Sequence, residues 1–156
     1  MIRAAMIFAP IFLVTFLVME LFSYFVHRFV YHGWAWFIHK SHHSPRKGMF
    51  EWNDIFPALF ASITAPFVMY AVGASRSLEL SAVALGITAY GLVYFIVHDL
   101  YVHRRMKRFR VRIPFLRTLK QAHAVHHRYG GEPYGLLFFA SPKKVATQKV
   151  DEAEPV

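Results

Sequence analysis

The ten histidines of this 156-residue chain fall into four short clusters that repeat one pair of spacings in the same order. Imidazole is a common ligand for iron, zinc, copper and nickel. Ten such ligands exceed the roughly four to six positions of a single ion, so the pattern predicts two ions in a shared site. Ten unrelated histidines would not repeat the same spacings. The predicted ligands are His27 and His32 (H-x4-H), His39, His42 and His43 (H-x2-HH), His98 and His103 (H-x4-H), and His123, His126 and His127 (H-x2-HH).

Helical geometry limits what each spacing can do. At about 100° per residue, the three histidines of an H-x2-HH cluster occupy one stripe of a helix. Histidines five residues apart diverge by about 140° on a regular helix. An H-x4-H pair can therefore straddle two ions, or converge on one ion if a π-bulge slows the turn. Both options suit a binuclear centre better than a single-ion site of the H-E-x-x-H type, which the chain lacks.

Several other metal sites are excluded by what the chain does not contain. It has no cysteine, which excludes thiolate zinc sites, iron–sulfur clusters and C-x-x-C-H haem attachment. No acidic residue stands three places before a histidine, so the Glu-x-x-His repeats of soluble di-iron bundles are absent as well. A nearly all-imidazole centre remains. Each ligating ring should donate its second N–H to a carboxylate or a backbone carbonyl, and Asp99, Glu51 and Asp54 are the candidate carboxylates. A solvated carboxylate at the interface is the alternative, stronger for Asp54 than for Asp99.

The elements that must position these histidines are apolar. Hydrophobic residues make up 56% of the chain, and three uncharged runs stand out. The second is long enough by itself to cross a membrane as a helix, and the first and third are long enough once continued to the histidines. The first run lacks a small-residue cleavage site and leads directly into His27, so we expect a retained span rather than a signal peptide. Three buried helices of a soluble protein are the alternative, but little polar sequence remains to cover them. The expected spans are about residues 4–26, 55–75 and 79–102.

The sequence therefore predicts an all-α fold: an integral membrane helical bundle with a cytoplasmic histidine-ligated di-metal site. We expect one membrane-embedded domain over residues 1–142. Pro114 indicates the start of a further helix that carries the fourth cluster. Residues 134–142 are apolar but too short to cross, which suggests a re-entrant or packed segment. Residues 143–156 have the polar composition of a disordered cytoplasmic tail.

Glu20 is an unusual residue for the first apolar run. An ionisable group at membrane depth is a candidate for a functional role. The alternative, which the sequence leaves open, is that Glu20 lies at the membrane interface.

Charge predicts the orientation of the spans. Of the 18 lysines and arginines, only Arg3 and Arg76 lie in the amino-terminal tail or the turn between the second and third runs. Lysine and arginine accumulate on cytoplasmic segments, so we expect an integral multi-pass protein of the cytoplasmic membrane with its amino terminus outside and its histidines on the cytoplasmic side. The net charge of +9 then calls for membrane lipids and an acidic electron carrier rather than for nucleic acid.

Four short sequences carry a family resemblance. HRFVYH, HKSHH, HDLYVH and HAVHH, in this order on a small membrane protein, resemble the fatty acid hydroxylase superfamily of membrane histidine-rich di-iron oxygenases. The stretches FIHKSHHSPRKGMFEWNDIF, AYGLVYFIVHDLYVHRR and QAHAVHHRYGGEPYGLLFFA are similar to bacterial β-carotene 3-hydroxylases. The likeness runs from about Glu20 to Pro142, and no histidine position departs from it.

The resemblance implies a reaction and its cofactors. Two iron ions held by the ten histidines, with O2 and external electrons, would hydroxylate carbon 3 of the β-ionone rings of β-carotene to give cryptoxanthin and zeaxanthin. The electrons would come from an electron-transfer protein such as ferredoxin and its reductase. Zinc, which binds such ligands more tightly than ferrous iron, can replace iron in a purified sample. The candidates for lining the route of the lipid-soluble carotenoid are Tyr24, Phe25, Tyr94, Phe95 and Phe139; ordinary packing or lipid-facing aromatics are the alternative for each.

Two other classes of function stay open at this point. The first is another histidine-rich di-iron membrane oxygenase, such as a carotenoid ketolase, or an acyl or sterol hydroxylase or desaturase; product analysis in cells that make β-carotene separates these. The second is a membrane metal transporter or a bis-histidine haem cytochrome. A transporter should carry ligands through the depth of a span, and haem would give a Soret band.

Overall fold

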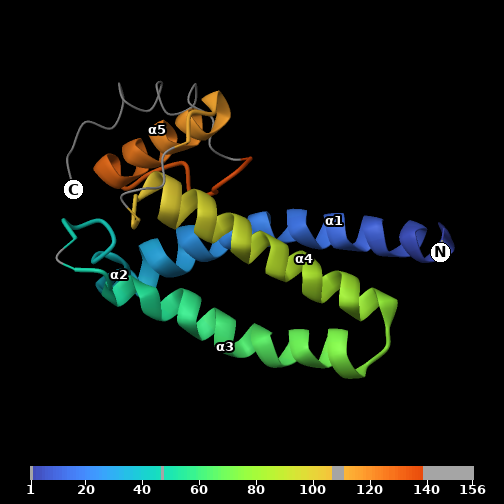
Figure 1. Ribbon diagram of the computed structural model, residues 1–156. Helices are drawn as coiled ribbons and strands as arrows, with labels where there is room; N and C mark the ends of the chain where they lie inside the picture. Colours follow the sequence, from blue (N-terminus) through green and yellow to red (C-terminus); the bar gives the residue numbers. More distant parts are fainter. Residues whose placement is uncertain (1, 47, 107–110, 139–156) are drawn as a thin grey trace.

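The computed structural model describes residues 2–46, 48–106 and 111–138, which form helices and loops without a strand. Figure 1 shows three long helices side by side and a shorter one across one end. The elements in chain order are α1 (Ile2–Phe25), η1 (Val26–Trp34), α2 (Trp36–His39), η2 (Trp52–Asp54), α3 (Ile55–Met69), η3 (Tyr70–Ala74), α4 (Leu78–Tyr94), η4 (Phe95–Val102) and α5 (Pro114–Tyr129). Three continuous helices are long and apolar enough to cross a membrane: Ile2–Trp34, Trp52–Ala74 and Leu78–Val102.

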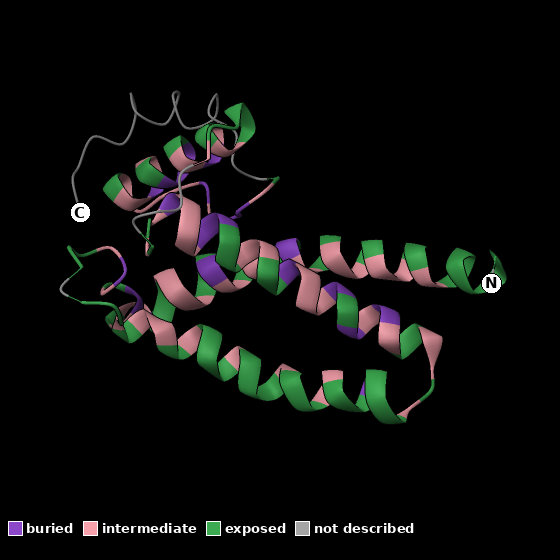
Figure 2. Cartoon of the chain, viewed as in Figure 1, coloured by how far each residue is buried: buried purple, intermediate pink, exposed green. Residues whose placement is uncertain are grey.

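The outer surface of the long helices is apolar. Large side chains such as Leu59 and Ile63 of α3 are 57% and 66% exposed, and exposed residues run along most of α3 in Figure 2. In water, such surface would cost roughly 25 cal/mol for each Å² left uncovered. Hydrocarbon covers it in a bilayer, where a helix also satisfies its own N–H and C=O groups. The expected all-α fold with three apolar spans is confirmed by helix length and composition.

Helices α1 and α4 approach each other closely because small residues lie between them. A Cβ atom at Gly86 of α4 would lie 2.8 Å from Thr15 Cβ and 2.9 Å from the Phe12 carbonyl oxygen of α1. Ala82 and Ala84 are fully buried nearby. Small residues let helix backbones meet inside a membrane, where packing rather than the hydrophobic effect drives association. This pair forms the closely packed part of the bundle, whereas α3 is mostly exposed (Figure 2).

The helices that carry the histidines all lie at one end of the bundle (Figure 1). The connection between α3 and α4, with Arg76, lies at the opposite end. Helix α5 begins at Pro114, as the sequence predicts, and ends at Gly130, whose φ of 72° forms a left-handed cap. The Gly130 N–H donates to the His126 carbonyl at 2.8 Å. Four separate segments thus converge where the apolar helices end.

Both H-x4-H pairs lie on π-helical turns, η1 and η4. The Ala35 N–H donates to the Val30 carbonyl at 2.9 Å, and the His103 N–H donates to the His98 carbonyl at 2.9 Å, each five residues back. Residues five apart are therefore neighbours on successive turns. Gly33, with φ −102° and ψ −126°, then kinks the chain into α2. Of the two predicted options for these pairs, the structure has the converging one.

Residues 130–138, which follow α5, run back along the bundle as an irregular segment that we call the strap. The expected re-entrant segment, 134–142, is described only as far as residue 138, and its described part is not helical. Phe139, residues 140–142 and the expected tail 143–156 lie outside the described residues.

Candidate metal centre

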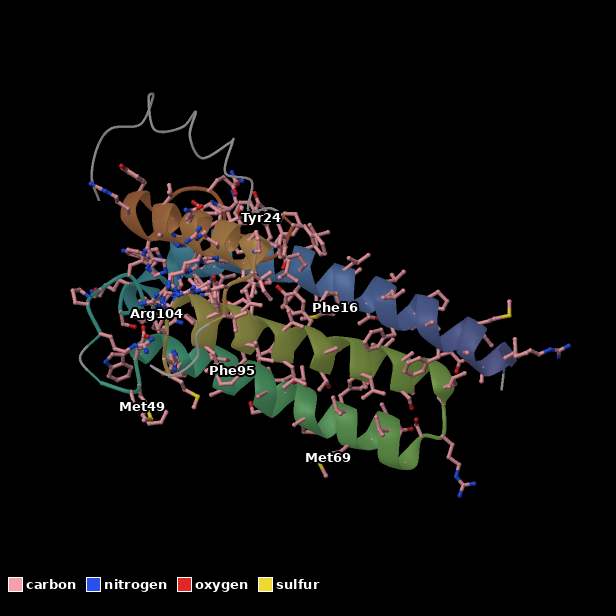
Figure 3. All side chains as sticks on the ribbon, turned by 45° about the horizontal axis from the view of Figure 1, so that its top comes forward. Phe16, Tyr24, Met49, Met69, Phe95 and Arg104 are labelled. Carbon is pink, nitrogen blue, oxygen red and sulfur yellow. The ribbon has the colours of Figure 1, made fainter. Side chains whose placement is uncertain are left out.

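Nine of the ten histidines form two groups whose ligand nitrogens lie within 4.8 Å of one another. Group A comprises His27, His32, His39, His43 and His126, and group B comprises His42, His98, His103 and His123. The ring of His127 lies beside both: its centroid is 4.2 Å from that of His43 and 4.5 Å from that of His123. Figure 3 shows the nitrogen-rich side chains gathered at the end of the bundle marked by Tyr24 and Arg104, away from Phe16 and Met69.

Each H-x2-HH cluster divides between the two groups. His39 and His43 belong to group A, whereas His42 between them belongs to group B. On α5 the division is reversed, because His123 belongs to group B and His126 to group A. His39 ends α2, and His42 and His43 lie in the turn that follows it, so one short segment supplies both groups. Each half of the chain therefore contributes histidines to both groups.

The ring nitrogens in each group point inward at one another. Nε2 to Nε2 distances are 3.1 Å for His27–His39, 3.1 Å for His32–His126 and 2.9 Å for His103–His123. The His27 Nδ1–H donates to the Tyr134 carbonyl at 2.8 Å, and the His39 Nδ1–H donates to Asn53 Oδ1 at 2.6 Å. The Nε2 atoms of this pair therefore carry bare lone pairs that repel each other unless a cation lies between them.

A bound ion fits these distances. Two nitrogen ligands at about 2.0–2.1 Å from one ion lie roughly 2.8–3.4 Å apart, the shorter distances in octahedral and the longer in tetrahedral coordination. Among the described residues, Nε2 of His42, His43 and His127 is buried without a hydrogen-bond partner. Buried polar atoms are ordinarily paired, and a ligating nitrogen is paired by its metal. The nitrogens that need a partner are those that face the interior of the centre.

Burial keeps the imidazoles in the form that binds metals. It lowers the pKa of His39 to about 3, of His43 to about 4 and of His127 to about 3. Burial likewise holds the pKa of His123 and of His126 well below the ordinary value. A histidine with such a pKa is neutral at pH 7, so its lone pair is free for a cation without release of a proton.

The acceptors behind the rings differ between the groups. In group B, His42 Nδ1 lies 3.2 Å from Glu51 Oε2, and His98 Nδ1 lies 3.0 Å from Asp99 Oδ1. In group A the acceptors are neutral: the Asn53 amide, the Tyr134 carbonyl, and the Gly131 carbonyl at 2.6 Å from His126 Nδ1. These bonds fix ring orientation, and carboxylates also make the imidazole a stronger donor.

Arg105 links the carboxylates behind group B. It forms a hydrogen bond with Asp54, and its guanidinium nitrogens lie 3.6 Å from Glu51 and 3.5 Å from Asp99. Glu51 also pairs with Arg46 at 2.8 Å. The pKa of Arg105 is raised by the three carboxylates against the effect of burial. Asp54 lies one step behind the rings, since its carboxylate accepts from the Glu51 backbone N–H at 3.0 Å and from Arg105.

Sequence reasoning missed the neutral acceptors. The one sequence signal for Asn53 is its place between the candidate carboxylates Glu51 and Asp54, and this signal is weak. The carbonyls of Gly131 and Tyr134 carry no sequence signal at all, because every residue has one.

The aromatic residues considered for the substrate route lie in different surroundings. The Tyr94 ring centroid is 4.6 Å from that of His98, and the ring packs against a core of Val97, Leu119 and Leu136. Phe25 and Phe95 are 48% and 47% exposed on the apolar surface. The Tyr24 hydroxyl donates to Glu132 at 2.6 Å and accepts from Arg28 at 2.6 Å. All of these contacts are packing and hydrogen-bonding contacts within the protein.

A cavity of about 610 Å³ reaches the centre from the side of the loops. Histidines of both groups line it, together with charged residues from the 44–51 loop and the segment after η4. The lining includes His42, His43, His103, His127, Arg46, Arg104, Arg105 and Glu51. Ser44, Pro45, Gly48 and Met49 complete its lining, and the apolar helices extend away from the opposite side of the centre (Figure 3).

Comparison with known proteins places the chain in a family. Residues 12–141 match the family model described as fatty acid hydroxylase. The β-carotene hydroxylase of Pseudescherichia vulneris is 40% identical over 129 residues, 80% of this chain and 72% of the relative. That of Pantoea ananas is 40% identical over 135 residues, 83% and 76% of the two chains. The chloroplastic β-carotene 3-hydroxylase 2 of Arabidopsis thaliana is 38% identical over 133 residues, 81% of this chain and 43% of the relative.

No solved structure matches the chain significantly. The family match and the bacterial relatives confirm the resemblance drawn from the histidine motifs. The chain belongs to the fatty acid hydroxylase family and is related within it to the β-carotene hydroxylases.

Proposed function

We propose that this protein is an O2-dependent β-carotene 3-hydroxylase, a membrane di-iron monooxygenase that converts β-carotene to cryptoxanthin and zeaxanthin. The observation that carries the proposal is the pair of inward-facing imidazole groups at the end of three apolar helices. The names and identities of the bacterial and plant relatives support the carotenoid as substrate.

All ten histidines would hold the two ions, with His127 completing group B. The support is a correspondence between the two halves of the chain: exchanging the halves converts group A into group B only if His127 belongs to group B. The His127 ring centroid is also 4.8 Å from those of His42 and His103. The corresponding pairs are His27 with His98, His32 with His103, His39 with His123, His42 with His126 and His43 with His127.

When bound, two iron ions would supply the reduction of dioxygen and the insertion of one oxygen atom into a ring C–H bond, while external electrons and protons convert the other oxygen atom to water. The residues of the chain position and insulate this chemistry. The acceptors behind the rings, with Asp99 and Glu51 the charged ones, hold the imidazoles in orientation, and Asp54 holds Glu51. The packed helices exclude water from the apolar side.

The carotenoid would reach the centre from the lipid. Exposed Phe25 and Phe95 on the apolar surface, and Tyr94 against the His98 ring, suit a route along which an ionone ring slides between helices. Tyr24 and Phe139 stay candidates for the same route.

Electrons would arrive from the opposite side. Lys40, Arg46 and Arg104 are exposed at the histidine end of the bundle, and complementary charge steers an acidic carrier such as ferredoxin, supplied by its reductase. The same basic residues suit anionic lipids at the cytoplasmic surface. We propose accordingly that the amino terminus lies outside, that the centre lies on the cytoplasmic side, and that residues 1–142 act as one membrane domain with a cytoplasmic tail.

The test is iron reconstitution without oxygen, followed by product analysis with β-carotene, ferredoxin and its reductase in air. We expect two irons per chain, no Soret band, and cryptoxanthin followed by zeaxanthin. His39→Ala in group A and His123→Ala in group B should each abolish turnover while the protein still inserts into membranes. Ketone or desaturated products would favour another oxygenase of the family. Full activity in either variant would refute the shared centre.

A further inference from the structure

We propose that Glu20 is a positioning residue for group A: it anchors the strap, whose backbone carbonyls orient the His27 and His126 rings. This role rests on the metal centre of the proposed function but not on its substrate. It also accounts for a carboxylate within the first apolar helix, where an ionisable group is costly unless it has a use.

Both carboxylate oxygens of Glu20 accept hydrogen bonds, one from the strap and the other from α4. The residue is 1% exposed. Its Oε1 accepts from the Leu137 N–H at 2.8 Å and from the Phe138 N–H at 3.2 Å, both in the strap. Its Oε2 accepts from the Tyr90 hydroxyl of α4 at 2.8 Å. A buried carboxylate tolerates its environment when its oxygens accept such bonds, and the irregular backbone of the strap obtains acceptors that a helix would supply internally.

The strap connects the residues bonded to Glu20 with the carbonyls that bond the candidate metal ligands. Within it, the Tyr134 carbonyl accepts from His27 Nδ1–H at 2.8 Å, and the Gly131 carbonyl accepts from His126 Nδ1–H at 2.6 Å. Both rings belong to group A. Only two residues, Gly135 and Leu136, lie between Tyr134 and Leu137, so the anchor at Leu137 limits how far the Tyr134 carbonyl can move. A displaced carbonyl would leave the ring free to rotate its Nε2 out of the group.

A second carboxylate ties the strap to the same helix face. Glu132 Oε1 accepts from the Tyr24 hydroxyl at 2.6 Å and from Arg28 at 3.0 Å, and Glu132 Oε2 accepts from the Tyr134 N–H at 3.2 Å. Glu20, Tyr24 and Arg28 are spaced four residues apart, so they lie in one row beside the strap. Glu132 fixes the polar end of the strap at this row, and Glu20 fixes the end that lies deeper among the helices.

The arrangement predicts a selective defect. The described acceptors behind His42 and His98 of group B lie on the 51–54 loop and on η4, not on the strap. Loosening the strap should therefore weaken metal binding at group A and spare group B. A role in folding alone would weaken both groups together.

The experiment compares three variants of the full-length chain in detergent, with cobalt(II) as a spectroscopic probe. Glu20→Leu removes the acceptors at similar size, and Glu20→Gln keeps one oxygen for the strap. Tyr90→Phe removes the bond to the other oxygen and leaves the oxygen that accepts from the strap in place. We expect wild type, Glu20→Gln and Tyr90→Phe to bind two cobalt ions per chain. Glu20→Leu should bind one unchanged and the other about 10- to 100-fold more weakly.

Double variants identify the weakened group. Adding His126→Ala to Glu20→Leu should cause little further loss, whereas adding His123→Ala should abolish tight binding. Hydrogen exchange at the Leu137 and Phe138 amides should accelerate in Glu20→Leu. Unchanged affinity, equal weakening of both ions, or a Glu20→Gln variant that behaves like Glu20→Leu would each overturn the role. Wild type that binds no cobalt would overturn the metal centre itself, whereas two ions without carotenoid hydroxylation would leave the Glu20 result standing.

Discussion

At the scale of single residues, the two histidine groups differ in the charge behind their ligands. Carboxylates accept from His42 and His98, while amide and carbonyl oxygens accept from His27, His39 and His126. A carboxylate partner raises the basicity of an imidazole and favours a more highly charged ion. The two metal positions are therefore inequivalent even though the halves of the chain repeat the same histidine spacings.

Replacing Asp99 tests this difference. Asp99→Asn keeps the size of the side chain but removes the charge behind His98, so we expect the affinity of group B for cobalt(II) to fall by about 10- to 100-fold while group A stays unchanged. Competition with a chelator measures both affinities. Glu79→Gln is the matched control, since its carboxylate bonds Ser77 at the far end of the bundle. Equal behaviour of the two variants would contradict a role for Asp99.

Arg105 is the cation that three carboxylates behind group B share. Arg105→Gln leaves Asp54, Glu51 and Asp99 without the cation that they share, so we expect a loss of about 2 kcal/mol in the free energy of unfolding, less than for a fully buried pair because solvent screens it in part. Chemical unfolding in detergent measures the loss. Arg104→Gln, at an exposed neighbour, should leave stability unchanged. A stability loss of the same size in both variants would mean that Arg105 has no special partners.

At the scale of elements, the length and hydropathy of a run are enough to predict a membrane-spanning helix, but not its local hydrogen-bond register. The spans were predicted because an uncharged run of sufficient length has few other stable environments. The first helix continues past the predicted end at residue 26 through the π-turn that carries His27 and His32, up to the kink at Gly33. Whether His27 and His32 converge depends on a backbone hydrogen-bond register that residue types do not specify. A packed segment was expected from residue 134 onward, but its contacts with Glu20 and the histidines were not, because its acceptors are carbonyls and Glu20 lies more than a hundred residues away in sequence.

Packing between elements can be tested at Gly86. Gly86→Ala places a Cβ 2.8 Å from Thr15 Cβ and 2.9 Å from the Phe12 carbonyl, so α1 and α4 must separate. We expect a loss of about 1–3 kcal/mol, seen as a lower midpoint of thermal unfolding in detergent. Gly91→Ala on the same helix meets nothing within 4 Å and should be neutral or stabilising by up to about 1 kcal/mol. If Gly86→Ala were as stable as Gly91→Ala, the close approach of α1 and α4 would not matter.

At the scale of the whole molecule, all ligand-bearing segments lie at one end of an apolar bundle (Figure 1). Under the proposed function, this position would let a substrate dissolved in lipid reach the centre from one side and a water-soluble electron carrier from the other. A centre buried at mid-membrane would be closed to the carrier. The cavity lined by His103 lies on the side proposed for the carrier, and the apolar helices lie on the side proposed for the substrate.

The orientation that we propose for the bundle rests on the distribution of lysine and arginine, and it can be tested directly because the sequence contains no cysteine. Ala74 lies exposed near the α3–α4 connection, and Ala124 lies exposed on α5 at the histidine end. Basic residues resist transfer across the membrane, so the end with few of them should face outward. A membrane-impermeant maleimide should label Ala74→Cys on intact cells, and Ala124→Cys only after permeabilisation. Labelling in the reverse order would place the centre outside, away from reduced ferredoxin, and would contradict both the topology and the proposed electron supply.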